Sequence, residues 1–159
     1  MAETKESVKN EVFTISIPHN VPEPMRWSAE SIGIDVYSAE AVSIPPHTTV
    51  MVKLNAKIME AALVFGRSSL WKMGVMLANG VGVIDGDYRG QISAPLMNFT
   101  DDTVNIEEGI RIAQIIPMRQ FRENSVVDFN VLADNNTFEN FDTLYPTDRG
   151  AGGFGSTWK

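Results

Sequence analysis

Four residues with chemically useful side chains stand close together at Asp85, Asp87, Tyr88 and Arg89, within the stretch LANGVGVIDGDYRGQI at 77–92. Two carboxylates two residues apart suit general-base or cation-binding chemistry, and the neighbouring tyrosine and arginine add a flat ring and a positive charge. Asp-Gly-Asp is also ordinary turn sequence, in which Asp side chains bond to nearby backbone. A calcium loop of the EF-hand type is excluded, because its fifth and twelfth positions would be Arg89 and Leu96.

The dipeptide Asn79-Gly80 lies directly before this group, between apolar residues on both sides. Asn-Gly flanked in this way is typical of a two-residue hairpin turn, which needs positive φ at both central positions. We therefore expect a hairpin that delivers Asp85 at its exit. Rigid strands would hold the carboxylate in place better than a loop does.

Short segments of alternating apolar and polar residues recur along the chain, centred on residues 13–17, 32–38, 50–54, 92–96, 110–114 and 127–131. Clusters of Pro, Gly, Asn and Asp separate them, which predicts an all-β sandwich, jelly roll or barrel. The one expected helix covers residues 69–73, with Ser68 or Ser69 as N-cap and Gly74 as its stop. Residues 132–148 are predicted to be a loosely ordered connection.

Composition limits the class of protein. With 159 residues, 43% of them hydrophobic, the chain fits one domain. The formal net charge of −7 argues against nucleic-acid binding, and the absence of cysteine excludes disulfides and thiol nucleophiles. We find no apolar signal segment and no run of membrane-spanning length, so we expect a soluble, cytoplasmic protein without a membrane or nucleic-acid partner.

The C-terminal segment 149–159, RGAGGFGSTWK, has three interpretations. A glycine-rich end is commonly a floppy tail, and an Arg-Gly-Gly-like patch can touch RNA, although the acidic charge disfavours that. It is not a Walker loop, because it lacks Gly-Lys-Ser/Thr. The third interpretation is an arm that closes over a ligand, in which Arg149 supplies charge, backbone N–H groups bind phosphate oxygens and Phe154 stacks on a flat ring.

Five separate segments, in this order, resemble the five motifs of the homotrimeric dUTP pyrophosphatases (dUTPases). They are SIGIDVYSAE at 31–40, GRSS at 66–69, ANGVGVIDGDYRG at 78–90, RIAQIIP at 111–117 and RGAGGFGST at 149–157. Their order, their spacing and the total length match the family, so the resemblance covers nearly the whole chain.

The resemblance implies a trimeric jelly roll, a distorted β-barrel with one short helix, that hydrolyses dUTP to dUMP and pyrophosphate with Mg²⁺. Residues 1–148 would form the jelly-roll domain, and residues 149–159 a flexible arm closing over the active site. The binding partners implied are dUTP and two further copies of the chain.

The resemblance also implies roles for individual residues. Asp85 would be the general base for the water that attacks the α-phosphorus. Tyr88 would lie against the deoxyribose and exclude a 2′-hydroxyl, and Asn79 with its neighbouring backbone, including Gly82, would bind the uracil edge. Asp35 would act on the metal indirectly, through water.

The remaining roles concern the phosphates and the arm. Phosphate groups would be held from a neighbouring subunit by Arg67, Ser68, Ser69 and Gln114. The N–H groups at the start of the short helix suit a phosphate on physical grounds as well. The arm would contribute Arg149, Phe154, Gly155, Ser156 and Thr157, with Phe154 over the base and the others on the γ-phosphate end.

Three features depart from the commonest family pattern. Gly66 stands where a proline usually precedes the arginine, the spacing from Arg67 to Gly74 is one residue short, and Trp158 replaces a glycine. Two other functions stay open. A dCTP deaminase shares the fold and an Arg-Ser-Ser element, although such enzymes typically carry Trp-Glu-Gly where this chain has Tyr-Arg-Gly at 88–90. A nucleotide-gated regulatory protein that binds a protein partner is the second alternative.

Overall fold

The computed structural model describes residues 12–153, and their backbone forms twelve strands in four small sheets with four short helices. The larger sheet, in spatial order, consists of β2 (Ile34–Tyr37), β11 (Arg111–Pro117), β6 (Ala62–Gly66) and β8 (Gly82–Ile84). The second sheet consists of β4 (Thr49–Lys53), β9 (Ser93–Asn98) and β7 (Val75–Leu77). These two sheets carry most of the candidate site.

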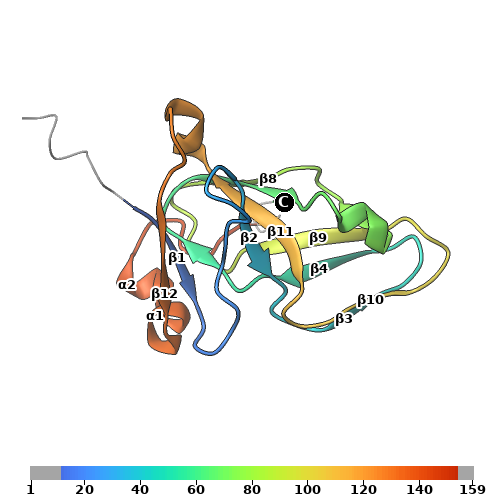
Figure 1. Cartoon of the computed structure of the whole chain (residues 1–159). Coiled ribbons are helices and arrows are strands. Elements are labelled where there is room, and N and C mark those ends of the chain that lie inside the picture. The colour runs from blue at the N-terminus through green and yellow to red at the C-terminus, as the bar shows by residue number, and fades with distance from the viewer. Residues whose placement is uncertain (1–11, 154–159) are drawn as a thin grey trace, which may run out of the picture.

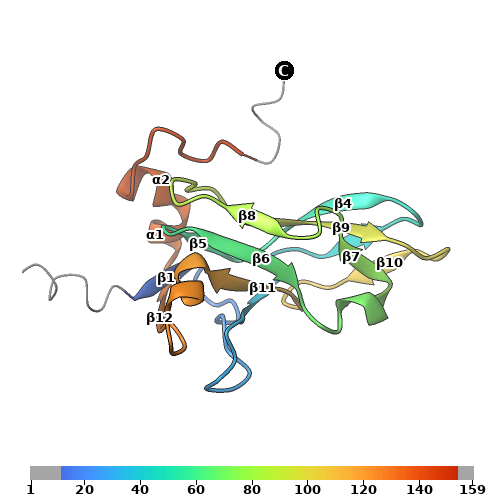
Figure 2. The same cartoon turned by 90° about the horizontal axis from the view of Figure 1, so that it is seen from above.

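Two smaller sheets lie at opposite ends of the molecule, as both views show (Figures 1 and 2). One contains β12 (Phe129–Ala133), β1 (Phe13–Ile17) and β5 (Lys57–Ile58), and the other pairs β3 (Val42–Ile44) with β10 (Val104–Ile106). β1 and β12 run parallel, with Phe13 opposite Phe129, whereas all other strand pairs are antiparallel.

The core forms where the alternating positions of the strands point inward. The side chains of Phe13, Ile15 and Ile17 on β1 and of Leu96 on β9 are fully buried. The predicted all-β, jelly-roll-like class is confirmed, and the predicted strands are found within a few residues of their expected positions. The sheets of the described residues do not close into a barrel, so the fold is jelly-roll-like and open.

The expected hairpin at Asn79-Gly80 is wrong. β7 pairs with β9 and β8 pairs with β6, so the two strands flanking the turn belong to different sheets. Gly80 has φ of +71°, but Asn79 does not have positive φ, and a primed hairpin turn requires it at both positions. The Gly80 N–H instead donates to the Leu77 carbonyl, and the turn carries the chain across from one sheet to the other.

The expected short helix is present as a 3₁₀ turn, η1 (Leu70–Met73). Gly74 ends it in the left-handed conformation, with φ of +86°, as predicted. Ser69 occupies the N-cap position without a capping hydrogen bond from its side chain. A short helical turn therefore forms after Arg67 within one residue of the predicted range.

The expectations of a single helix and of a loose connection at 132–148 are wrong. A second 3₁₀ turn, η2 (Met118–Arg122), follows β11, and α1 (Asn135–Glu139) and α2 (Phe141–Leu144) follow β12. The Asp134 side chain caps α1 by accepting from the Thr137 N–H at 2.7 Å, and Phe141 is fully buried. Phe141 also contacts the ring of Tyr145, with ring centroids 5.0 Å apart. No helix within residues 12–153 has the length and apolar sequence needed to cross a membrane.

Candidate active site

Nine of the predicted site residues fall into two separate pockets of the chain. The first pocket, of about 170 Å³, lies between β6, β8 and β9 and is lined by five of them: Asn79, Gly82, Asp85, Tyr88 and Arg149. The second lies beside β2 and β11 and is lined by Asp35, Arg67, Ser68 and Gln114. Within one chain, then, the proposed base and sugar contacts lie apart from the proposed phosphate contacts.

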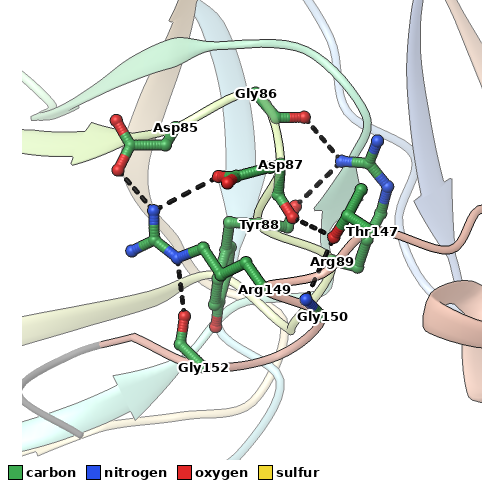
Figure 3. Close-up of polar contacts among 9 residues, drawn as sticks. All are labelled: Asp85, Gly86, Asp87, Tyr88, Arg89, Thr147, Arg149, Gly150 and Gly152. Carbon is green, nitrogen blue, oxygen red and sulfur yellow. Dashed lines mark hydrogen bonds and ion pairs between the residues drawn. The ribbon is translucent and has the colours of Figure 1, made fainter. Parts of the chain in front are cut away.

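Asp85 follows β8 directly and begins a turn that the Tyr88 N–H closes by donating to the Asp85 carbonyl at 3.1 Å. The Asp85 and Asp87 side chains are 58% and 57% exposed, and both accept from Nη1 of Arg149 (Figure 3). The distance to Asp87 is 3.3 Å. The hydrogen bond to Asp85 is the main reason that the pKa of Arg149 is raised above its usual value. One arginine thus faces two solvent-accessible carboxylates.

Tyr88 forms one wall of the first pocket and is only 6% exposed. Its Oη donates to the Gln91 carbonyl at 3.0 Å, and the guanidinium carbon of Arg149 lies 5.7 Å from the ring centroid. Burial raises the pKa of Tyr88, and the charge of Arg149 opposes this with a smaller effect. The ring is therefore fixed at its polar tip and presents a neutral face to the pocket.

The second pocket is built around Asp35 on β2, which lies opposite Gln114 on β11. The Asp35 carboxylate is nearly buried and forms ion pairs with Arg67, whose Nε lies 3.2 Å away, and with Arg111, whose Nη1 lies 3.5 Å away. Nε2 of Gln114 donates to the Gly66 carbonyl at 3.1 Å, and a Cβ on Gly33 would lie 2.0 Å from Oε1 of Gln114. The Asp35 charge is balanced by arginines, of which Arg67 also lines the pocket.

Ser68 is exposed in the second pocket, whereas Ser69 is the half-buried N-cap of η1 outside its lining. The sequence also placed Phe154, Gly155, Ser156 and Thr157 in the site. These four lie outside the residues that the structure describes.

Two residues with evident contacts in the site received no role from the sequence. Asp87 shares Arg149 with Asp85, and Arg111 shares Asp35 with Arg67. Strict alternation places Arg111 and Gln114 on opposite faces of β11, but the register shifts between Arg111 and Ala113. Beside this irregularity Arg111 contacts Asp35, the pocket residue opposite Gln114, and alternation alone does not reveal that contact.

A metal site formed by protein ligands alone is not present in residues 12–153, where no three His, Cys, Asp or Glu side chains come together. Asp85 and Asp87 are more than half exposed although both contact Arg149, whereas the Asp35 carboxylate is nearly buried between two arginines. Two exposed carboxylates suit Mg²⁺, which keeps several waters and takes further oxygens from substrate phosphates. The residues present therefore fit a loosely held Mg²⁺.

Comparisons with known proteins agree on one family. A family model described as dUTPase matches residues 19–158. A deoxyuridine 5′-triphosphate nucleotidohydrolase of Candida albicans is 35% identical over 140 residues, which are 86% of this chain and 80% of that protein. The enzyme of the same name from Acinetobacter baylyi is 34% identical over 146 residues, 86% of this chain and 87% of its own. The crystal structure of dUTPase from Streptococcus mutans superposes with a TM-score of 0.60 at 32% identity, covering 77% of this chain and 99% of that one.

Proposed function

The chain belongs to the dUTPase family, and from this premise we propose that it hydrolyses dUTP to dUMP and pyrophosphate by attack of water on the α-phosphorus. The observation that carries the proposal is the first pocket, where an accessible carboxylate, Asp85, stands beside the buried ring of Tyr88 and the amide of Asn79. A base, a flat wall and an amide are the groups needed to activate water, hold a sugar and bind a pyrimidine edge.

Asp85 is the proposed general base. It lines the pocket, whereas Asp87 contacts the same arginine without lining it. A carboxylate facing a triphosphate needs positive charge nearby, and the Nη1 contact shows that Arg149 reaches this position. In the proposed complex Arg149 turns toward the phosphates, and the released carboxylate orients the attacking water.

Tyr88, Asn79 and Gly82 are the proposed contacts to the nucleoside. The hydroxyl of Tyr88 is held by Gln91, so its ring cannot retreat to admit a larger sugar. A Cβ on Gly82 would lie 3.2 Å from Cβ of Val64 and 3.7 Å from Nδ2 of Asn79. Glycine at this position therefore lets β8 pack closely against Val64 on β6, beside the amide that would bind uracil.

Arg67, Ser68, Ser69 and Gln114 are the proposed phosphate contacts, supplied to the first pocket by a neighbouring copy of the chain. The separation of the two pockets within one chain supports this arrangement, because neither pocket alone holds a complete set of groups. A closed threefold ring would bring the second pocket of each protomer to the first pocket of the next. We propose a homotrimer on this basis.

Mg²⁺ is the proposed cofactor, and when bound it would offset the negative charge of the triphosphate. Asp85 and Asp87 offer accessible oxygens for it, and Asp35 would contribute indirectly through water. The C-terminal arm, with Phe154, Gly155, Ser156 and Thr157, is proposed to cover the base and the γ-phosphate. Closure of such a segment excludes water and holds the reacting groups together.

Product analysis tests the proposed function. The purified protein is incubated with dUTP, dCTP, dTTP and UTP, with and without Mg²⁺, and the products are separated. We expect dUMP and pyrophosphate from dUTP and no hydrolysis of the other three nucleotides. The rate with dUTP should be highest in the presence of Mg²⁺. Ammonia released from dCTP would identify a deaminase instead. Nucleotide binding without turnover of any of the four would favour the regulatory alternative, which needs a protein partner to be found.

A further inference from the structure

The hydroxyl of Thr147 is one of the contacts that join the loop carrying Asp85 to residues 145–150, the root of the C-terminal arm. Its Oγ1 donates to the Asp87 carbonyl at 2.5 Å and accepts from the Gly150 N–H at 3.0 Å (Figure 3). The hydroxyl thus bridges two segments that lie 60 residues apart in the sequence. A threonine side chain has one donor and two acceptor lone pairs, so both bonds can form together.

Arg89 reinforces the same junction from the other side. Its backbone N–H donates to the Gly150 carbonyl at 2.7 Å, and its guanidinium donates to the Tyr145 carbonyl at 2.8 Å and to the Gly86 carbonyl at 2.7 Å. The planar fork of arginine suits two carbonyls at fixed directions. Tyr145 and Gly150 are therefore held on either side of Thr147.

Arg149 lies inside this junction. Its backbone is fixed between Thr147 and Gly150, and its Nε donates to the Gly152 carbonyl at 2.8 Å. The carboxylates of Asp85 and Asp87 that it faces are more than half exposed, and contacts between exposed charges do little by themselves to fix a geometry. The hydrogen bonds of Thr147 and Arg89 to the backbone supply the fixed geometry that these ion pairs lack.

We propose that Thr147 and Arg89 are positioning residues, which clamp the root of the arm to the catalytic loop and so aim Arg149 at the carboxylates and, in the complex, at the substrate phosphates. The inference rests on the proposed function and adds residues to it. Neither side chain lines the first pocket, so both act through Arg149 and not on the substrate.

The test uses Thr147→Val, which keeps the shape and removes the hydroxyl, with Thr147→Ser as the variant that restores it. Thr143→Val is the matched control, since Thr143 is exposed on α2 and its hydroxyl makes no hydrogen bond within the described chain. We expect Thr147→Val to lower kcat/KM for dUTP on the order of 10–100-fold, because small misplacements of a charged group weaken catalysis strongly. Thr147→Ser should recover most of it, and Thr143→Val should match the parent chain.

Two further measurements separate positioning from a general structural role. When Thr147→Val is added to Arg149→Ala, kcat/KM should fall by less than twofold relative to Arg149→Ala alone, because the effect of Thr147 passes through Arg149. Amide hydrogen exchange of Gly150 should be faster in Thr147→Val and unchanged in Thr143→Val. This readout does not depend on turnover, so it holds even if the parent chain fails to hydrolyse dUTP, a failure that would count against the proposed function alone. Unchanged exchange at Gly150, or an equal loss of activity with and without Arg149, would overturn the clamp.

Discussion

Gly90 and the ring of Tyr88 are in direct contact: a Cβ built on Gly90 would lie 2.4 Å from Oη and 2.6 Å from Cζ of Tyr88. Gly90 is buried, and the Tyr88 hydroxyl is tied to the Gln91 carbonyl. The tyrosine that walls the candidate pocket is therefore seated on a backbone position where only glycine leaves enough room.

This contact predicts that Gly90→Ala disturbs both stability and the pocket. The added methyl group must displace the ring, and overpacking of this kind costs about 1–3 kcal/mol in the free energy of unfolding. Urea denaturation measures the loss, and dUTP hydrolysis should fall in parallel. Gly86→Ala is the control, because a Cβ there meets only the Ala61 nitrogen at an ordinary 3.6 Å. Equal stability of the two variants would contradict the seating of Tyr88 on Gly90.

Asp85→Asn should abolish most turnover while leaving nucleotide binding in place. The amide keeps the size of the side chain and removes the base, and loss of a positioned general base costs about 10²–10⁴-fold in rate. The rate is measured by release of pyrophosphate, and binding by titration with a non-hydrolysable dUTP analogue. Asp87 also contacts Arg149 but does not line the pocket. Asp87→Asn should therefore lower the rate of hydrolysis less than Asp85→Asn does. Near-parental turnover by Asp85→Asn would remove this residue from the mechanism.

The raised pKa of Tyr88 predicts a loss of stability in alkaline solution. The folded chain holds the phenolic proton more tightly than the unfolded chain, in which the pKa of tyrosine is about 10. The stabilisation is complete below that pH and is lost as pH rises through the folded pKa. The difference in unfolding free energy between the parent chain and Tyr88→Phe, measured between pH 8 and pH 11, should begin to change to the disadvantage of the parent chain above about pH 10. A constant difference across this range would show that Tyr88 does not titrate in this way.

Shared sites between protomers predict complementation of two inactive variants. Arg67→Ala removes a phosphate contact of the second pocket, and Asp85→Asn removes the base of the first. After mixed dissociation and reassembly at equal amounts, about a quarter of the sites should combine an intact Arg67 from one copy with an intact Asp85 from another. Activity of the mixture against dUTP measures this fraction. Light scattering that shows an active monomer would exclude the arrangement.

Alternation and turn residues were enough to predict the strands and the all-β class, because these depend on local patterns, whereas the jelly roll and the roles of the group at Asp85 came from the resemblance of five motifs to a known family. The hairpin predicted at Asn79-Gly80 is wrong because strand pairing depends on the whole fold and not on the turn alone. β7 pairs with β9, and β8 pairs with β6. Arg111 was missed because a shift of register on β11 changes which face it occupies.

The hydrogen bonds at the root of the arm could not be predicted from the sequence either. Thr147 sits in a polar segment that was expected to be loose, and its importance depends on carbonyls of residues that no spacing relates to it. The two short helices before it have few residues and weak periodicity. The buried Phe141, together with the contacts of Lys57 to Phe138, holds this segment against the core.

The parallel pairing of β1 with β12 has a consequence for synthesis of the chain. Residues 13–17 leave the ribosome early, yet one edge of that strand has no partner until residues 129–133 follow, and its other edge meets β5 at only two positions. At about 5–20 residues per second, the wait lasts roughly 6–22 s. Throughout that time an apolar strand edge is open to association with other chains. Release of the C-terminal strand is thus the event that ends the vulnerability of the nascent protein to aggregation.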